Sequence, residues 1–90
     1  MVKNLIQEKN KQLTNAMTYG HITNLLNSIL KKDFKSIYSI CPRTVKRYAY
    51  GDYLPTKPDI INALAKLCKV SPNELMDNLR AYRKQTRSTV

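Results

Sequence analysis

Apolar residues recur at every third or fourth position along most of this chain, which is the spacing of one buried helix face. The strongest stripe lies on residues 21–32 and follows the i, i+3, i+4, i+7, i+8 series: Ile22, Leu25, Leu26, Ile29 and Leu30. Similar spacing covers residues 2–17, 60–68 and 75–82. The pattern predicts helices that each bury one face in a shared core.

The middle of the chain is predicted to hold two short helices joined by a three-residue break. Asp33 suits the N-cap of the first, over about residues 33–38, because its carboxylate can accept from the free backbone N–H groups. The shared apolar face of this helix would hold Phe34, Ile37 and Tyr38. Pro42 suits the first position of the second helix, since proline has no N–H to leave unpaired there. That helix is expected to run to about Tyr50 and to end at Gly51.

Three further helix ends carry local signals. Gly20 is expected to end the N-terminal helix in a left-handed conformation. Thr56 and Asp59 have capping-box spacing around Pro58, and Ser71, Pro72 and Glu74 combine an N-cap, a first-position proline and a capping glutamate. The sequence thus predicts an all-α, single compact bundle of about five to six short helices. Residues 1–20 are expected to form a helical extension, residues 21–80 the main domain, and residues 81–90 a basic tail that frays beyond Tyr82.

Composition narrows the class of partner. The 90 residues suffice for one core, and 42% hydrophobic content with only two glycines favours helices. Sixteen Lys and Arg against six Asp and Glu give a formal net charge of +10, concentrated in residues 31–50 and 80–90. This excess favours a polyanionic partner, with a solvated basic surface as the alternative.

Other functional classes find little support. Cys41 and Cys68 form no CxxC pair and His21 is the only histidine, so we expect no metal, and two reduced, buried thiols. No glycine-rich phosphate loop, paired carboxylates or nucleophile motif suggests an enzyme, a cofactor or a small-molecule ligand. No long apolar run or signal-peptide pattern is present, so the expected compartment is the cytoplasm, with no membrane contact.

Two short helices, the second bearing exposed cations, are typical of a helix-turn-helix. On the second helix, Val45 and Tyr48 can face the core. The remaining surface would then carry Arg43, Lys46, Arg47 and Tyr50. These residues are the candidates for DNA contact.

Several motifs strengthen this interpretation: residues 44–51, Pro55, residues 64–66 and residues 70–75. Over about residues 22–76 the chain resembles the Cro and lambda-repressor family of DNA-binding domains. The resemblance implies that the second helix lies in the major groove, with Pro42, Arg43 and Thr44 at the bases and Lys46 and Arg47 one turn on. The sequence departs from the family at Lys35, where the family usually has alanine, and at Ser39, where it usually has glycine.

Chemistry suggests a role for each candidate. Arg43 and Arg47 are expected to read guanine, because a guanidinium can donate twice to O6 and N7. Contacts to phosphate or to a thymine methyl suit Thr44, Lys46, Tyr50 and Tyr53, and Lys35 is a further DNA-binding candidate. For the C-terminal cations Arg80, Arg83, Lys84 and Arg87, both DNA contact and plain solvation stay open.

The function expected from the sequence is therefore a sequence-specific regulator, of repressor type, that binds double-stranded DNA as a homodimer. The alternative is a protein-interaction module, such as an antitoxin or an accessory subunit, with DNA binding secondary. Its surface, or equally a dimer interface, would use the apolar residues Leu5, Ile6, Leu13, Leu75, Met76, Leu79 and Tyr82. RNA binding is less favoured, because the aromatic and glycine pattern of sheet-based RNA modules is missing.

Overall fold

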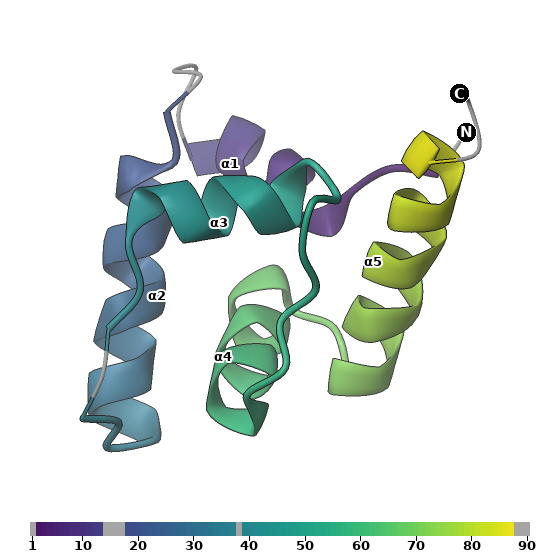
Figure 1. The fold of residues 1–90 in the computed structure, drawn as a ribbon. Coiled ribbons are helices and arrows are strands. Elements are labelled where there is room, and N and C mark those ends of the chain that lie inside the picture. The colour runs from purple at the N-terminus through teal and green to yellow at the C-terminus, as the bar shows by residue number, and fades with distance from the viewer. Residues whose placement is uncertain (1, 14–17, 38, 88–90) are drawn as a thin grey trace.

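Five helices pack around one core in the computed structural model, which describes residues 2–13, 18–37 and 39–87. They are α1 (Leu5–Leu13), α2 (Gly20–Asp33), α3 (Pro42–Ala49), α4 (Pro58–Cys68) and α5 (Pro72–Arg87). Helices α2, α4 and α5 stand side by side, while α3 lies crosswise at one end with α1 behind it (Figure 1). The described residues contain no strand, so the predicted all-α bundle is confirmed.

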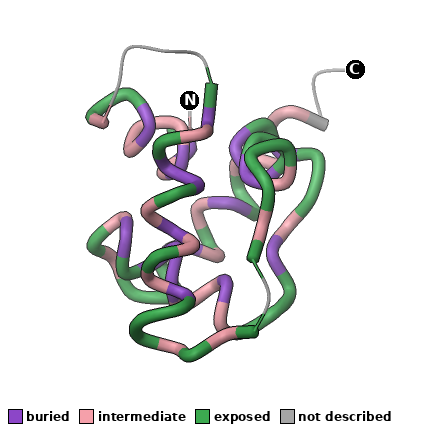
Figure 2. The backbone as a smooth tube through the Cα atoms, turned by 90° about the vertical axis from the view of Figure 1, so that its left-hand side faces the viewer, coloured by how far each residue is buried: buried purple, intermediate pink, exposed green. Residues whose placement is uncertain are grey.

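The core draws fully buried apolar side chains from every helix. They are Ile6 from α1, Ile22, Leu26 and Leu30 from α2, Val45 from α3, Leu64 from α4, and Leu75 and Leu79 from α5. Figure 2 shows buried positions alternating with exposed ones along the tube, as the apolar stripes predict. Burying a side chain of this size contributes about 1.5–3 kcal/mol, so all five helices stabilise one fold.

The N-terminal helix belongs to this core instead of extending from it. Helix α1 contacts each of the other four helices. Three residues of the predicted dimer or partner surface, Ile6, Leu75 and Leu79, are fully buried, and Leu5, Leu13 and Met76 pack against the same core. These side chains are therefore taken up by contacts within the chain. The part of the predicted N-terminal helix that reaches Met17 lies outside the described residues.

The prediction of a short helix over residues 33–38 is wrong. Asp33 is the last residue of α2, and its carboxylate pairs with Lys66 of α4 instead of capping a new helix. Lys35 takes a left-handed φ of 50°, and the Ser36 N–H donates to the Leu30 carbonyl at 3.0 Å, which turns the chain away from the helix axis. Ile37, expected on a buried face, is fully exposed, and Tyr38 lies outside the described residues.

The connection from α2 to α3 is consequently non-helical wherever it is described over residues 34–41. Asn27 fixes it alongside α2, because its amide both donates to the Ile40 carbonyl and accepts from the Ile40 N–H, each at 2.9 Å. The described residues of this connection therefore do not form the first helix of the expected helix-turn-helix. Helix α3 reaches its position through this fixed connection.

The helix starts predicted from prolines are confirmed, whereas only some of the predicted N-caps form. Pro42, Pro58 and Pro72 each open a helix, and the Ser71 hydroxyl accepts from the Glu74 N–H at 3.1 Å as an N-cap should. Helix α4 is capped at Lys57, however, so the predicted Thr56 capping box does not form. Proline position was therefore the more reliable signal.

Two predicted helix ends are also wrong. Gly20 begins α2 instead of ending the preceding helix. The segment expected to fray beyond Tyr82 continues α5 as far as Arg87, because Tyr82, Arg83 and Thr86 pack against the turn at Gly51. Only residues 88–90 of the expected tail lie outside the described residues.

Candidate nucleic-acid interface

Helix α3 divides cleanly into a buried face and a cationic face. Val45, Tyr48 and Ala49 point into the core, whereas Arg43, Lys46 and Arg47 are exposed. All charged side chains on this helix are basic. The predicted division of the second helix is confirmed, and its exposed face can accept an anionic partner.

The N-terminal segment holds α3 in place through two side-chain amides. Asn4 Nδ2 donates to the Tyr48 carbonyl at 3.3 Å, and Gln7 Nε2 donates to the Ala49 carbonyl at 2.7 Å. Asn4 also caps α1, because its Oδ1 accepts from the N–H groups of Ile6 and Gln7. Neither amide is predicted from the sequence, although an asparagine directly before an apolar stripe is a recognisable N-cap signal.

The opposite end of α3 presents Cys41 and Thr44 to solvent. Cys41 is the extended N-cap residue and is exposed, so its predicted burial is wrong. Its Sγ lies 3.3 Å from the Thr44 Oγ1, and this hydrogen bond lowers the pKa of the Cys41 thiol. A hollow of about 420 Å³ beside this end is lined by Thr18, Tyr19, Pro42, Arg43 and Lys46.

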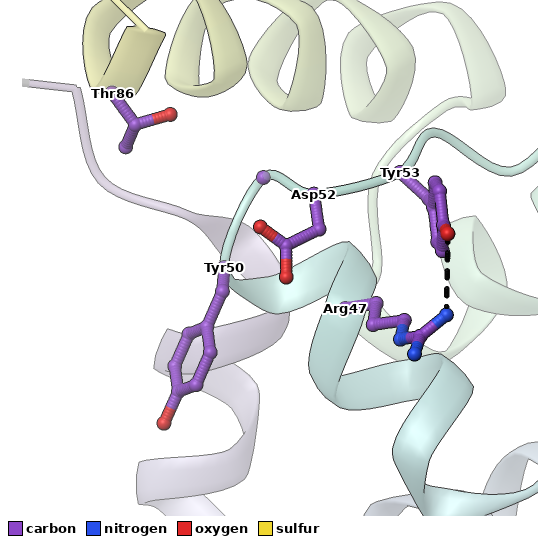
Figure 3. A pocket seen from close by; sticks show the side chains of 6 residues that line it. Arg47, Tyr50, Asp52, Tyr53 and Thr86 are labelled. Atoms are coloured by element: carbon purple, nitrogen blue, oxygen red, sulfur yellow. Dashed lines mark hydrogen bonds between the residues drawn. The ribbon is translucent and has the colours of Figure 1, made fainter. Parts of the chain in front are cut away.

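Each cation on the second half of α3 rests on a tyrosine ring. The Arg47 guanidinium lies 5.1 Å from the ring centre of Tyr53, and its Nη1 donates to the Tyr53 hydroxyl at 3.2 Å (Figure 3). The Lys46 Nζ lies 5.6 Å from the ring centre of Tyr50. Such contacts contribute about 0.5–1 kcal/mol at exposed sites, and here they orient both cations.

Tyr50 is itself held by a buried neighbour. Its ring meets that of Tyr19 edge to face, with centroids 6.1 Å apart. Burial, followed by the proximity of Tyr50, raises the pKa of Tyr19 to about 12. The neutral Tyr19 ring therefore supports Tyr50, which in turn supports Lys46.

A second hollow, of about 480 Å³, opens where α3 ends and α5 passes nearby. It is lined by Arg47, Tyr50, Gly51, Asp52, Tyr53 and Thr86 (Figure 3). Asp52 is the single acid of this lining, and no carboxylate in the described part of the chain lies within 4.0 Å of Arg43, Lys46 or Arg47. The cations of α3 are thus available to an external anion.

The structure brings together seven of the eight predicted site residues: Pro42, Arg43, Thr44, Lys46, Arg47, Tyr50 and Tyr53. Lys35 is the exception. It follows the C-terminal end of α2, whereas the start of α3 adjoins Tyr19 at the N-terminal end, about 20 Å away along the helix. Lys35 is exposed but does not belong to this surface.

Comparison of the chain with models of protein families, with curated proteins and with solved structures finds no match. Among the described helices, none is long and apolar enough to cross a bilayer. Within the same residues, no three His, Cys, Asp or Glu side chains gather as a metal site would require. A functional assignment therefore depends on the geometry of α3 and its surroundings.

Proposed function

We propose that this protein is a cytoplasmic gene regulator of repressor type that binds double-stranded DNA by placing α3 in the major groove. The observation that carries the proposal is the exposed face of α3, where Arg43, Lys46 and Arg47 stand free of carboxylates while Val45 anchors the opposite face. A major groove about 12 Å wide admits a helix of about 10–12 Å diameter. An α-helix with one buried and one cationic face fits that groove.

We assign different roles to the two arginines on the basis of their positions and contacts within the chain. Arg43 lies in the first turn of α3, near the end that enters the groove in DNA-reading helices, and is the base-reading residue of this proposal. Arg47 lies in the last turn and is bound to Tyr53 from the following turn. A guanidinium and a hydroxyl side by side suit one phosphate, so Arg47 and Tyr53 set position and affinity.

A homodimer is part of the proposal. Helix α3 has 8 residues and is therefore about 12 Å long, enough for one half-site. Two half-sites about 34 Å apart would give a two-fold symmetric operator. Because Ile6, Leu75 and Leu79 are buried within one chain, the dimer contact lies elsewhere or forms only on DNA. Sedimentation with duplexes carrying one or two half-sites distinguishes a monomer from a pair.

The decisive experiment compares two triple variants that each lower the net charge from +10 to +7. R43Q/K46Q/R47Q changes the face of α3, and K11Q/K31Q/K32Q removes exposed lysines at the ends of α1 and α2. Affinity for a labelled duplex is measured by fluorescence polarisation at rising salt. Since each phosphate contact adds about 0.9 to the log–log slope, loss of the phosphate contacts of Lys46 and Arg47 should lower the slope of the α3 variant by up to about 1.8, and the control variant should keep the wild-type slope.

Two outcomes would refute the proposal. If wild-type binding to duplex DNA shows no salt slope, the partner is not DNA. If both triple variants weaken binding equally, the α3 face is not the interface. Selection of duplexes from a random library supplies the specific site, and Arg43→Ala should then weaken binding to the selected sequence more than to random DNA.

A further inference from the structure

The C-terminal half of α5 lies directly against the turn that follows α3. Gly51 in this turn has a φ of +81°, and a Cβ placed on it would lie 3.1 Å from the Thr86 Oγ1 and 3.4 Å from the Arg83 Cα. Only a residue without a side chain fits easily between these atoms. Figure 1 shows the same approach, with the last turns of α5 beside the end of α3.

This approach places a second cluster of cations next to the α3 surface. A hollow of about 240 Å³ is lined by Leu54, Arg80, Arg83 and Lys84. Leu54 directly follows Tyr53, the residue that holds Arg47, so the turn joins the two basic regions. The basic regions of α3 and α5 thus lie on either side of residues 51–54, which carry the acid Asp52 and no cation.

The charges of this cluster are incompletely compensated. Arg80 approaches Asp77 only at 4.0 Å, with both side chains exposed. No ion pair in the described part of the chain includes Arg83 or Lys84. Three neighbouring positive charges repel one another, and an anion in the hollow would relieve that repulsion.

Arg83, which lines the hollow, also carries an unsatisfied donor. Its Nε is buried and has no hydrogen-bond partner. A buried donor without an acceptor is unfavourable, and a charged donor is more so. Phosphate oxygens are strong acceptors that match the fork of a guanidinium.

We propose that the hollow formed by Leu54, Arg80, Arg83 and Lys84 binds a backbone phosphate of the same DNA duplex that α3 reads. The inference rests on the proposed function and adds a second phosphate-binding element to it. The exposed Arg80 and Lys84 supply donors, and the guanidinium of Arg83 adds a third positive charge to the lining. The turn at residues 51–54 sets the position of this site relative to the one at Arg47 and Tyr53.

The test uses the full chain and the variant R80Q/K84Q, whose two changed side chains are both exposed on α5. One phosphate contact contributes a slope of about 0.9, equivalent to an about eightfold gain in affinity at 0.1 M relative to 1 M salt. The variant should therefore lower the slope by up to about 0.9 and weaken binding at 0.1 M by up to about eightfold, equally for selected and random duplexes. The control K31Q/K32Q, with the same loss of charge, should keep the wild-type slope.

Two further measurements locate the contact. Ethylation interference should show flanking phosphates that are required by the wild type and no longer required by R80Q/K84Q. R83K keeps the charge but removes Nε, and it should reduce interference at those same phosphates without changing base preference.

The outcomes separate this inference from the proposed function. If R43Q/K46Q/R47Q loses DNA binding while R80Q/K84Q matches K31Q/K32Q, the α5 site is refuted and the function of α3 stands. If inorganic phosphate at millimolar concentration protects the wild type against heat but not R80Q/K84Q, and the DNA slopes are equal, the hollow binds free phosphate and the inference is again refuted. Absence of any salt-dependent duplex binding by the wild type would refute the proposed function itself.

Discussion

Replacing Gly51 by alanine tests the junction between α3 and α5. An L-residue in the left-handed conformation of Gly51, at φ +81°, costs about 1–2 kcal/mol. The new Cβ would also press on the Thr86 Oγ1 at 3.1 Å, and this hydroxyl donates to the Arg83 carbonyl at 2.9 Å. Displacing it sacrifices a hydrogen bond of about 0.5–1.5 kcal/mol. The free energy of unfolding should fall by about 2–3 kcal/mol in total.

Urea and thermal denaturation followed by circular dichroism measure this loss. For a chain of this size, about 1 kcal/mol shifts Tm by about 4–8 °C, so Gly51→Ala should lower Tm by roughly 10–20 °C. The double variant G51A/T86A removes the hydroxyl that the Cβ would meet. Relative to T86A alone, its loss should shrink toward the about 1–2 kcal/mol of backbone strain.

Gly20→Ala is the matched control. Gly20 is the first residue of α2, and a Cβ there would meet nothing within 4 Å. The substitution should be neutral or should stabilise by about 0.4–1 kcal/mol, because alanine restricts the unfolded chain. A loss below about 0.5 kcal/mol for Gly51→Ala, or an equal loss for both glycines, would refute the reasoning.

Asn4, Cys68 and Cys41 each provide a separate test. Asn4→Ala removes the cap of α1 and a donor to the Tyr48 carbonyl, so the free energy of unfolding measured with urea should fall by about 2–3 kcal/mol. The control Asn24→Ala, at an exposed position, should lower it by less than about 0.5 kcal/mol, and similar losses for both variants would contradict the role of Asn4. Burial raises the pKa of Cys68 from its ordinary 9.0 to about 11 in the folded state. The stability that the neutral, buried thiol contributes is present below pH 9 and lost as the pH rises through about 11. Over that range the free energy of unfolding of the wild type should fall by about 2 kcal/mol more than that of C68A, and parallel curves of stability against pH for the two proteins would contradict the raised pKa. Exposed Cys41, with its lowered pKa, should react with iodoacetamide at least about tenfold faster than Cys68 by peptide mass spectrometry, and equal rates would exclude the described environments.

The apolar periodicity of the sequence predicted the core because it depends only on helix geometry. Leu26 and Leu30 on α2 and Leu64 on α4 were assigned to buried stripes, and all three are fully buried. The helix starts at Pro42 and Pro72 were equally accessible, since a proline at the first helical position has a purely local cause. The division of α3 into two faces follows from the same periodicity.

The errors arose where local chemistry is ambiguous. Asp33 has the side chain of an N-cap, yet an aspartate also suits the exposed end of a helix that gains an ion pair, here with Lys66. Helix α2 ends because Lys35 adopts a left-handed conformation, and a lysine gives no sequence signal for that conformation. The hydrogen bonds between Asn27 and Ile40 then fasten the end of the following segment to α2.

Contacts between distant segments could not be predicted from periodicity at all. The continuation of α5 past Tyr82 depends on its packing against Gly51, a residue in another part of the chain. Arg83 belongs to a segment whose composition is typical of a solvated tail, but in the fold it lies beside the turn after α3. The relation between the two cationic regions is therefore a property of the tertiary structure.

One side chain couples these regions mechanically. Gln7 Nε2 donates to the Ala49 carbonyl at the end of α3, at 2.7 Å, and to the Tyr82 hydroxyl on α5, at 3.0 Å. The N-terminal segment, which was predicted to be an extension, thus holds α3 in place of the first helix of the expected motif. Because a single amide on α1 binds both elements, a displacement of α3 relative to α5 would have to break one of these bonds. The face of α3 and the hollow on α5 are therefore held at a fixed separation, which is the condition for both to contact one duplex together.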